Sequence, residues 1–188
     1  MKIYKVRPDT SFRMMYPPDE VYESESWEFK CHELVDKIPQ FDAYWDDDTS
    51  KPLPDIAYLG MSAFAFKKDV AEQMTDILES AGEMLPFYIE GELWYYLNVM
   101  EKCESLLDEE KTKYKINQGN IKLIIEDYVF KPEFLSDSSI FKIPQDNHTE
   151  TFCADRREND EQVINNFFCA VHGNGFSGLK FTEVFSDE

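Results

Sequence analysis

The sequence predicts an α+β fold: a single domain, residues 1–188, with a mainly antiparallel β-sheet and two to three packed helices. Strand patterns are grouped along the chain and do not alternate regularly with helical patterns, which favours this class over a parallel α/β sheet. A length of 188 residues suits one domain. Hydrophobic residues make up 43% of the chain and aromatic residues 15%, enough for an aromatic-rich core.

The first part of the chain combines one strand with irregular structure. Alternation predicts a strand over Lys2–Val6, and the two prolines of "YPPDE" predict an exposed connection within Arg7–Pro18. A short amphipathic helix ending at Pro39 is expected next, and a strand at "SWEFKC" is the alternative. The helix rests on four apolar residues at helical spacing: Trp27, Cys31, Leu34 and Ile38.

The middle of the chain carries the clearest helix and the clearest hairpin. Asp55–Phe66 alternates small and aromatic residues and is expected to be extended. A helix is predicted to follow and to stop at Gly82. Its apolar stripe is Val70, Met74, Ile77, Leu78 and Ala81. Strands over Met84–Gly91 and Leu93–Glu101, joined by a tight link, predict a β-hairpin.

The C-terminal part adds further strands and one more helix. We expect a strand over Ile121–Phe130, then two shorter strands in "SIFKIP" and "ETFCADR" on either side of a polar turn, Gln145–Thr149. "GLKFTEVF" supplies the last strand.

The helix before this last strand is predicted to begin at Asn159, which has Gln162 three residues later in a capping-box arrangement, and to end at Gly173. Its buried stripe is expected to contain Val163, Phe167, Ala170 and Val171.

Charge restricts the partners that this chain can bind. The formal net charge is −19, from 19 Lys and Arg against 38 Asp and Glu. Such a surface repels nucleic-acid phosphates and anionic lipids, so we expect neither nucleic acid nor membrane as a partner, whereas a basic protein would be attracted. The alternative is that the acidic excess serves only solubility.

Cysteine usage and the start of the chain indicate a compartment. Cys31, Cys103, Cys153 and Cys169 are widely separated, and the sequence has no CxxC pair. "MKIYKVRPDT" has no apolar signal-peptide region, and no run approaches membrane-spanning length. We therefore expect a cytoplasmic protein with free thiols.

One acidic loop stands out as a candidate site. In "FDAYWDDDTSKPLPD", Tyr44 and Trp45 precede Asp46, Asp47 and Asp48, an aromatic anchor beside a polar rim that is typical of protein interfaces. The alternative is that the two aromatic residues pack in the core while the aspartates face water. A second acidic candidate partner-binding surface is Asp108, Glu109 and Glu110.

Motifs for metals, nucleotides and nucleophiles are weak, and we predict no cofactor. "HELVD" at His32 lacks the second histidine of HExxH, and Cys169 with His172 forms only half of a zinc set. "GNGFSG" matches GxGxxG, but a helix precedes it and a strand follows, which is the reverse of a dinucleotide site. There is no GxSxG.

With these segments in order, the chain from about residue 55 to 185 resembles the MXAN-type immunity family, the immunity proteins of bacterial polymorphic toxin systems formerly described as a domain of unknown function. The resemblance rests on "SAFAFKKDVAEQMTDILESAGEMLPF", "LWYYLNVMEKCESLLDEEKTKY", "IIEDYVF", "SIFKIP" and "GFSGLKFTEVF". Residues 1–54, with the acidic loop, carry less of it and form a variable N-terminal segment. The resemblance implies a cytoplasmic, non-enzymatic protein that binds and neutralises a toxin encoded beside it.

Two other classes remain open from the sequence. A metal-dependent hydrolase would use Asp46, Asp47 and Asp48 with His32, although consecutive residues on an extended loop point to different sides. An acidic adaptor or regulatory domain would bind some other basic protein.

Overall fold

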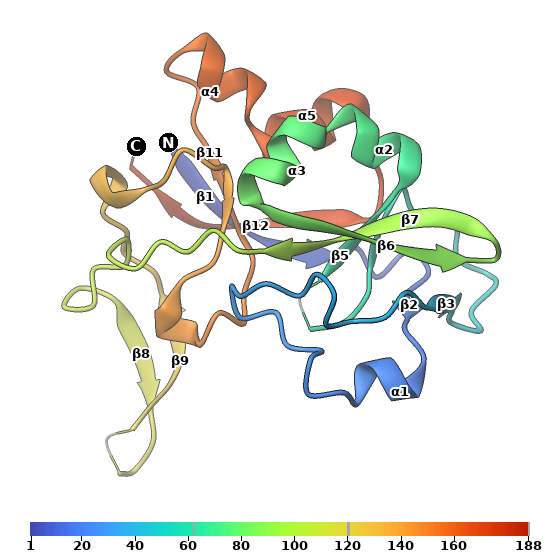
Figure 1. Cartoon of the computed structure of the whole chain (residues 1–188). Helices are drawn as coiled ribbons and strands as arrows, with labels where there is room; N and C mark the ends of the chain where they lie inside the picture. The colour runs from blue at the N-terminus through green and yellow to red at the C-terminus, as the bar shows by residue number, and fades with distance from the viewer. Residues whose placement is uncertain (62, 120, 188) are drawn as a thin grey trace.

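The structure is a computed structural model that describes residues 1–61, 63–119 and 121–187 (Figure 1). Its strands are β1 Lys2–Pro8, β2 Met15–Tyr16, β3 Asp42–Trp45, β4 Ile56–Tyr58, β5 Phe64–Lys67, β6 Gly82–Ile89, β7 Glu92–Val99, β8 Lys113–Ile116, β9 Lys122–Asp127, β10 Ile140–Phe141, β11 Phe152–Asp155 and β12 Leu179–Ser186. Its helices are α1 Asp19–Tyr22, α2 Lys68–Gln73, α3 Thr75–Ala81, α4 Asp160–Ile164 and α5 Phe167–Asn174, with 3-10 turns at Pro132–Phe134 and Pro144–Asp146.

The strands form three sheets in which antiparallel pairing dominates. One sheet has the order β10-β11-β1-β12, a second has β2-β3-β6-β7-β5-β4, and β8 with β9 forms a third. Only β3 and β6, among the described strand pairs, run parallel. Because β1 pairs with β12, the two ends of the chain lie side by side (Figure 1). The predicted α+β class with a mainly antiparallel sheet is confirmed.

The helices and the N-terminal segment cover different sides of the sheets. Figure 1 shows α2, α3 and α5 together on one side, with α1 and the loop after it on the other. Under the helices, one apolar cluster includes Phe66, Leu78 and Phe167. On the other side, Trp27 packs edge-on against Phe41, with ring centroids 5.8 Å apart, in a second cluster. None of the helices in the described ranges is long and apolar enough to cross a bilayer.

The helix predicted between Trp27 and Pro39 is absent, and the segment follows a series of turns. Two of its residues adopt left-handed backbone angles, Cys31 with φ 59° and Asp36 with φ 63°, and such residues interrupt an α-helix. Trp27 and Leu34 are nevertheless buried. Their spacing therefore reflects burial in the aromatic core and not a helical period.

The helix predicted to end at Gly82 is real but broken at Met74, whose angles of −119° and 18° separate α2 from α3. Gly82 does follow the last helical residue, but its φ of 163° is extended and not left-handed. Glycine is needed there because an added Cβ would lie 2.0 Å from the backbone oxygen of Asn98 on β7. The residue thus marks a close strand contact.

The predicted hairpin of β6 and β7 is confirmed over its full length, from Gly82 opposite Val99 to Ile89 opposite Glu92. Its two-residue turn, Glu90 and Gly91, has positive φ at both positions, which matches the right-handed twist of the strands. The extended region after Asp55 is also confirmed, as the antiparallel pair β4 and β5.

The C-terminal helix is split into α4 and α5. Asn159 caps α4 as predicted, because its side chain accepts a hydrogen bond from the backbone N–H of Gln162 at 2.9 Å. Asn166 then caps α5, which ends at Asn174 with Gly175 as its C-cap, and not at Gly173. Val163, predicted to be buried, is 43% exposed because α4 stands away from the core.

Candidate functional site

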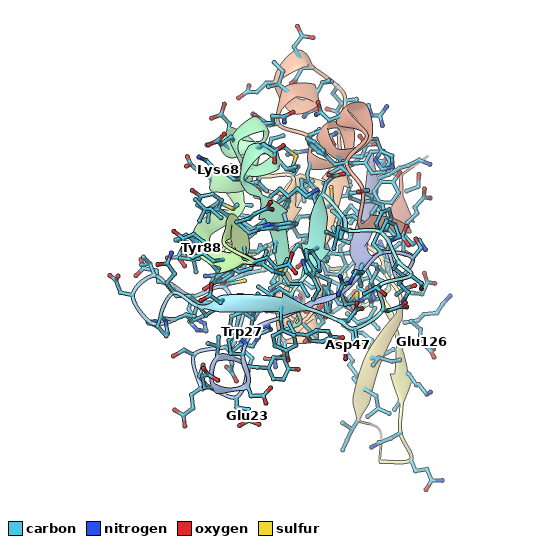
Figure 2. The ribbon with its side chains drawn as sticks, turned by 90° about the vertical axis from the view of Figure 1, so that its right-hand side faces the viewer. Glu23, Trp27, Asp47, Lys68, Tyr88 and Glu126 are labelled. Atoms are coloured by element: carbon cyan, nitrogen blue, oxygen red, sulfur yellow. The ribbon has the colours of Figure 1, made fainter. Side chains whose placement is uncertain are left out.

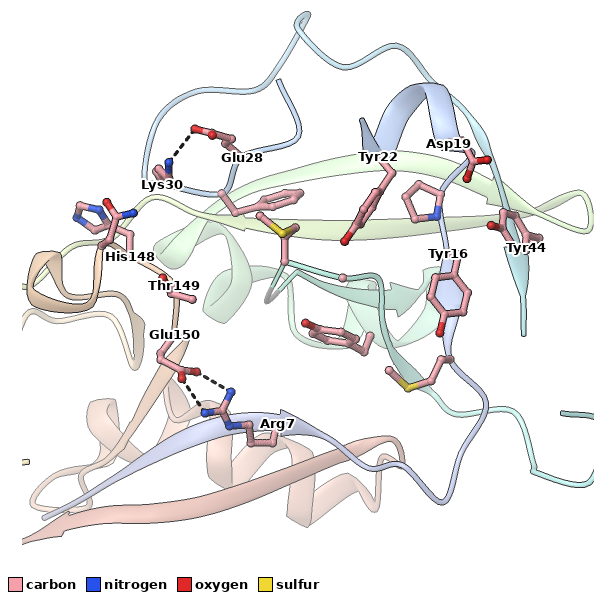
Figure 3. A pocket seen from close by; sticks show the side chains of 17 residues that line it. Arg7, Tyr16, Asp19, Tyr22, Glu28, Lys30, Tyr44, His148, Thr149 and Glu150 are labelled. Carbon is pink, nitrogen blue, oxygen red and sulfur yellow. Dashed lines mark hydrogen bonds and ion pairs between the residues drawn. The ribbon is translucent and has the colours of Figure 1, made fainter. Parts of the chain in front are cut away.

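A pocket of about 680 Å³ opens between the N-terminal segment and the loop at 147–150 (Figure 3). Aromatic and methionine side chains form much of its lining: Met14, Tyr16, Tyr22, Phe29, Tyr44, Tyr58 and Met61. They come from β2, α1, β3, the end of β4 and the loops beside these elements. We call this the tyrosine pocket. Its walls therefore combine segments that lie far apart in the sequence.

Three tyrosines of the pocket present large areas to solvent. Tyr16 is 42% exposed, Tyr22 49% and Tyr44 50%. β2 and β3 pair so that Tyr16 lies opposite Tyr44, and their rings stack with centroids 5.9 Å apart. Tyrosine gives large contact area with little conformational entropy to lose on binding. The pocket is therefore a preformed surface for an apolar or cationic group.

A buried lysine connects two walls of the pocket. Lys142 is 1% exposed, and its Nζ donates to the carbonyl oxygens of Phe29 at 2.6 Å and His148 at 3.0 Å. Burial disfavours the charged ammonium and lowers the pKa of Lys142 to about 8. Because Phe29 and His148 are both in the lining, these hydrogen bonds fix the width of the pocket at that end.

Charged side chains at the rim are largely paired with one another. Arg7 makes a bidentate ion pair with Glu150, with nitrogen to oxygen distances of 2.7 and 2.6 Å, and Lys30 lies 3.0 Å from Glu28 (Figure 3). Asp19 forms no ion pair with any residue in the described ranges. The tyrosine rings and Asp19 therefore favour a cationic group over an anionic one.

The loop 147–150 that closes one side of the pocket is held by the partly buried carboxyl of Asp146. Asp146 accepts hydrogen bonds from the backbone N–H groups of Thr149 at 3.2 Å and Glu150 at 3.1 Å. Burial raises the pKa of Asp146 to about 6 despite these bonds. Burial and the nearby Lys142 ammonium lower the pKa of His148. Asp146 and His148, whose pKa values are both shifted, thus lie in or beside the pocket wall.

The two predicted aromatic anchors point in different directions. Tyr44 lies in the tyrosine pocket, whereas Trp45 is only 8% exposed and packs edge-on against Trp94 with centroids 5.7 Å apart. The alternation of side chains along β3 causes this difference, since adjacent residues of a strand face opposite sides. The position of Trp45 fits the packing alternative.

The three aspartates of the acidic loop also differ. Asp46 is partly buried, and it accepts from Arg13 Nε at 3.2 Å and from the Met14 backbone N–H at 3.0 Å. The hydrogen bond from Met14, with that from Arg13, lowers the pKa of Asp46. Asp48 accepts from the Ser50 N–H and pairs with Lys51, and Asp47 is exposed. Asp46 and Asp48 thus have separate local partners, and Asp47 faces solvent.

The second acidic candidate does not join the first. Asp108, Glu109 and Glu110 precede β8, on the opposite side of the molecule from β3 in Figure 1. Asp108 lies 3.3 Å from Lys111, and Glu109 lies 3.3 Å from the Gln145 side chain. The predicted site residues therefore belong to two separate surfaces.

No arrangement suited to a metal ion is found in the described ranges. In residues 1–61, 63–119 and 121–187, no three His, Cys, Asp or Glu side chains gather as a set of ligands. The structure thus does not bring His32 to Asp46, Asp47 and Asp48, or Cys169 and His172 to Cys31. All four cysteines are free thiols. "GNGFSG" links α5 to β12, the order expected for a helix stop and not for a nucleotide loop.

The sequence reasoning missed Tyr16, Tyr22 and Met61. Tyr16 and Tyr22 flank the run "PPDEV", so they combine exposed aromatic residues with acid in the way that singled out Tyr44. That signal was present, but Tyr16 lay in a segment assigned only to a connection and Tyr22 in a stretch assigned to no element. Met61 carried no signal, because its 49% exposure depends on the turn after β4.

Comparison with known proteins adds no relative to these observations. No family model matches the chain, and none of the curated proteins compared with it matches its sequence.

Proposed function

We propose that this protein is an immunity protein: a stoichiometric inhibitor, without catalytic activity of its own, that binds a cognate toxin and neutralises it in the bacterial cytoplasm. The observation that carries the proposal is the tyrosine pocket, a preformed aromatic surface on a chain of net charge −19. The resemblance of residues 55–185 to the MXAN-type immunity family agrees with it.

The chemistry of the pocket favours a basic surface on the toxin. A Lys or Arg side chain placed over Tyr16, Tyr22 or Tyr44 gains cation–π attraction, which grows when the contact is desolvated. The long-range field of the acidic surface raises the rate of encounter with a cationic protein. Affinity then depends on the buried aromatic contacts and not on the total charge.

The exposed carboxylates beside the pocket extend this surface. Asp19 lies in the pocket lining, and Asp47 follows β3, the strand that carries Tyr44. Neither is involved in the ion pairs that hold the rim together. They form the polar rim of an interface whose centre is aromatic.

The direct test is co-expression with the protein encoded by the adjacent reading frame. We expect that frame to encode a toxin, and cells that express it to survive only when this protein is also produced. Survival should depend on Tyr44, and the variant Tyr44→Ala should protect less well at equal protein levels. Failure of the wild-type protein to protect cells would reject the proposal.

A further inference from the structure

β8 and β9 form an arm, residues 113–127, that projects from the body of the molecule (Figures 1 and 2). The two strands pair with each other in a sheet of their own. Within the part of the chain that the structure describes, no further strand pairs with either of them. Each therefore has an outer edge whose backbone N–H and C=O groups are available to another strand.

The arm is apolar as well as projecting. Four of its large side chains are more than half exposed: Ile116 54%, Ile121 61%, Leu123 54% and Ile124 59%. Only at its base do side chains such as Ile125 pack against the body. Exposed β-strands of this composition are templates for pairing with another chain, and natural proteins protect them unless they are used.

Charge singles out the arm from the rest of the molecule. The arm, residues 113–127, has three lysines against Glu126 and Asp127, a net charge of +1, whereas the rest of the chain has 16 Lys and Arg against 36 acidic residues. The acidic bodies of two copies repel each other, but salt screens that repulsion within about 8–10 Å. The arm is thus the place where two copies can touch with the least electrostatic cost.

The sequence of β9 is complementary to itself. It reads "KLIIED" from Lys122 to Asp127. Antiparallel pairing centred on Ile124 places Lys122 of each copy opposite Glu126 of the other and places Leu123 opposite Ile125. Opposite charges and apolar residues across a strand pair both stabilise a sheet. The two-fold symmetry forms each of these pairs twice.

The outer edge of β9 is open to such a partner. A groove of about 680 Å³ separates the last residues of β9, Ile125–Asp127, from β12, so β12 does not cover the strand there. Glu126 is exposed near the base of the arm (Figure 2). Lys122 lies over the Tyr114 ring of its own arm, 3.9 Å from the centroid, and makes a long ion pair of 3.9 Å with Glu109, and both side chains of that ion pair are more than half exposed. We propose that two copies of this protein associate through β9, forming a continuous four-stranded sheet with β8 at each edge.

Charge reversal tests the register. The variant Lys122→Glu sets Glu opposite Glu126, and the variant Glu126→Lys sets Lys122 opposite Lys, so each alone should dimerise about tenfold more weakly than wild type. Sedimentation equilibrium over a concentration series measures this. Lys37→Glu makes the same change in net charge as Lys122→Glu, at an exposed site away from the arm, and should leave the dimer intact.

Mixing the two weakened variants gives the sharpest result. In the mixed dimer, Glu at position 122 of one copy meets Lys at position 126 of the other, and the two remaining wild-type residues also have opposite charges. An equimolar mixture should therefore recover wild-type association. Loss of folding in either variant would not be repaired by mixing, so recovery supports the register and its absence counts against it.

The apolar centre of the proposed dimer interface, Ile124, is tested with a matched control variant. Ile124→Asp should give a monomer, whereas Ile164→Asp, at a site on α4 that is 71% exposed, should not. Circular dichroism at concentrations where both are monomeric checks that the fold is kept. A wild-type protein that stays monomeric up to ~0.5 mM overturns the proposal, as does a dimer unaffected by Ile124→Asp. A monomer whose arm variants lose toxin binding would assign the arm to the toxin and also overturn it.

Discussion

Asp46, Asp47 and Asp48 show how three identical neighbours take on different roles. Asp46 bridges to Arg13 and the backbone of Met14, Asp48 closes a local turn with Ser50, and Asp47 faces solvent. The sequence predicted an acidic loop, and the structure describes one. The division of roles was not predictable, because it depends on Arg13, which lies 33 residues earlier and reaches the loop only through the pairing of β2 with β3.

We expect Asp46→Asn to lower the free energy of unfolding by about 1–2 kcal/mol, because it weakens charge-assisted hydrogen bonds at a partly buried site. Asp47→Asn should change it by less than about 0.5 kcal/mol, as at most exposed positions. Urea denaturation of the two variants measures the difference. Equal effects would contradict the assignment of Asp46 as the structural member of the loop.

The raised pKa of Asp146 should make the free energy of unfolding depend on pH. Its pKa is about 6 in the folded protein and 3.8 ordinarily, so between these values the folded state binds more protons than the unfolded state. Its contribution to stability is therefore full below pH 3.8 and is lost as the pH rises through 6. Asp146→Asn removes this titration.

The stability of the Asp146→Asn variant relative to wild type should therefore increase by about 1 kcal/mol from pH 5 to pH 7. Chemical denaturation of both proteins at the two pH values gives the comparison. If the free energies of unfolding of wild type and Asp146→Asn changed in parallel between the two pH values, Asp146 would have the same pKa in the folded and unfolded states, which would contradict the prediction.

Among the helices and strands, the sequence predicted correctly those features that depend on residues close together in the chain. The β6–β7 hairpin followed from two apolar runs and a glycine turn, and the Asn159 cap followed from its spacing to Gln162. The helix at residues 27–39 failed because tertiary packing of Trp27 in an aromatic cluster replaced helical periodicity. β8 was not predicted, although lysines alternate with Tyr114 and Ile116 along it, because the alternating run is only four residues long and packs little against the body.

Two glycines that were both assigned to helix ends should respond in opposite ways to alanine. Gly82→Ala should destabilise the β6–β7 hairpin by roughly 3 kcal/mol or more, because its Cβ would lie 2.0 Å from the Asn98 oxygen. Gly173→Ala should stabilise α5 by up to about 1 kcal/mol, because nothing lies within 4 Å and alanine is the better helix former. Thermal unfolding of both variants tests this, and similar melting temperatures would contradict it.

For the whole molecule, fold class and net charge were predictable, but the candidate site was predicted only in part. Tyr44 was identified, yet the pocket around it also needs Tyr16, Tyr22 and the loop at 147–150. Contacts between segments more than 100 residues apart, such as Lys142 with the Phe29 carbonyl, bring these walls together. No local pattern carries that information.

Electrostatic steering should be visible in the rate of association with the proposed toxin partner. The double variant Asp47→Asn/Asp48→Asn should associate more slowly and show a weaker salt dependence, with the fold unchanged. Stopped-flow measurements between low and physiological salt provide the test. Asp46 is left intact because its change would also alter stability. An unaltered rate at low salt would place the contact surface elsewhere.

The most direct test of the proposed interface is the affinity of the purified protein for the proposed cognate toxin, measured by calorimetry for Tyr44→Ala, Tyr16→Ala and Tyr88→Ala. Tyr88 is the matched control, because it is 36% exposed on β6 and lies outside the tyrosine pocket (Figure 2). We predict that the two pocket variants lose about 30-fold or more in affinity while Tyr88→Ala binds like wild type. Full affinity in both pocket variants would contradict the assignment of this pocket to the toxin.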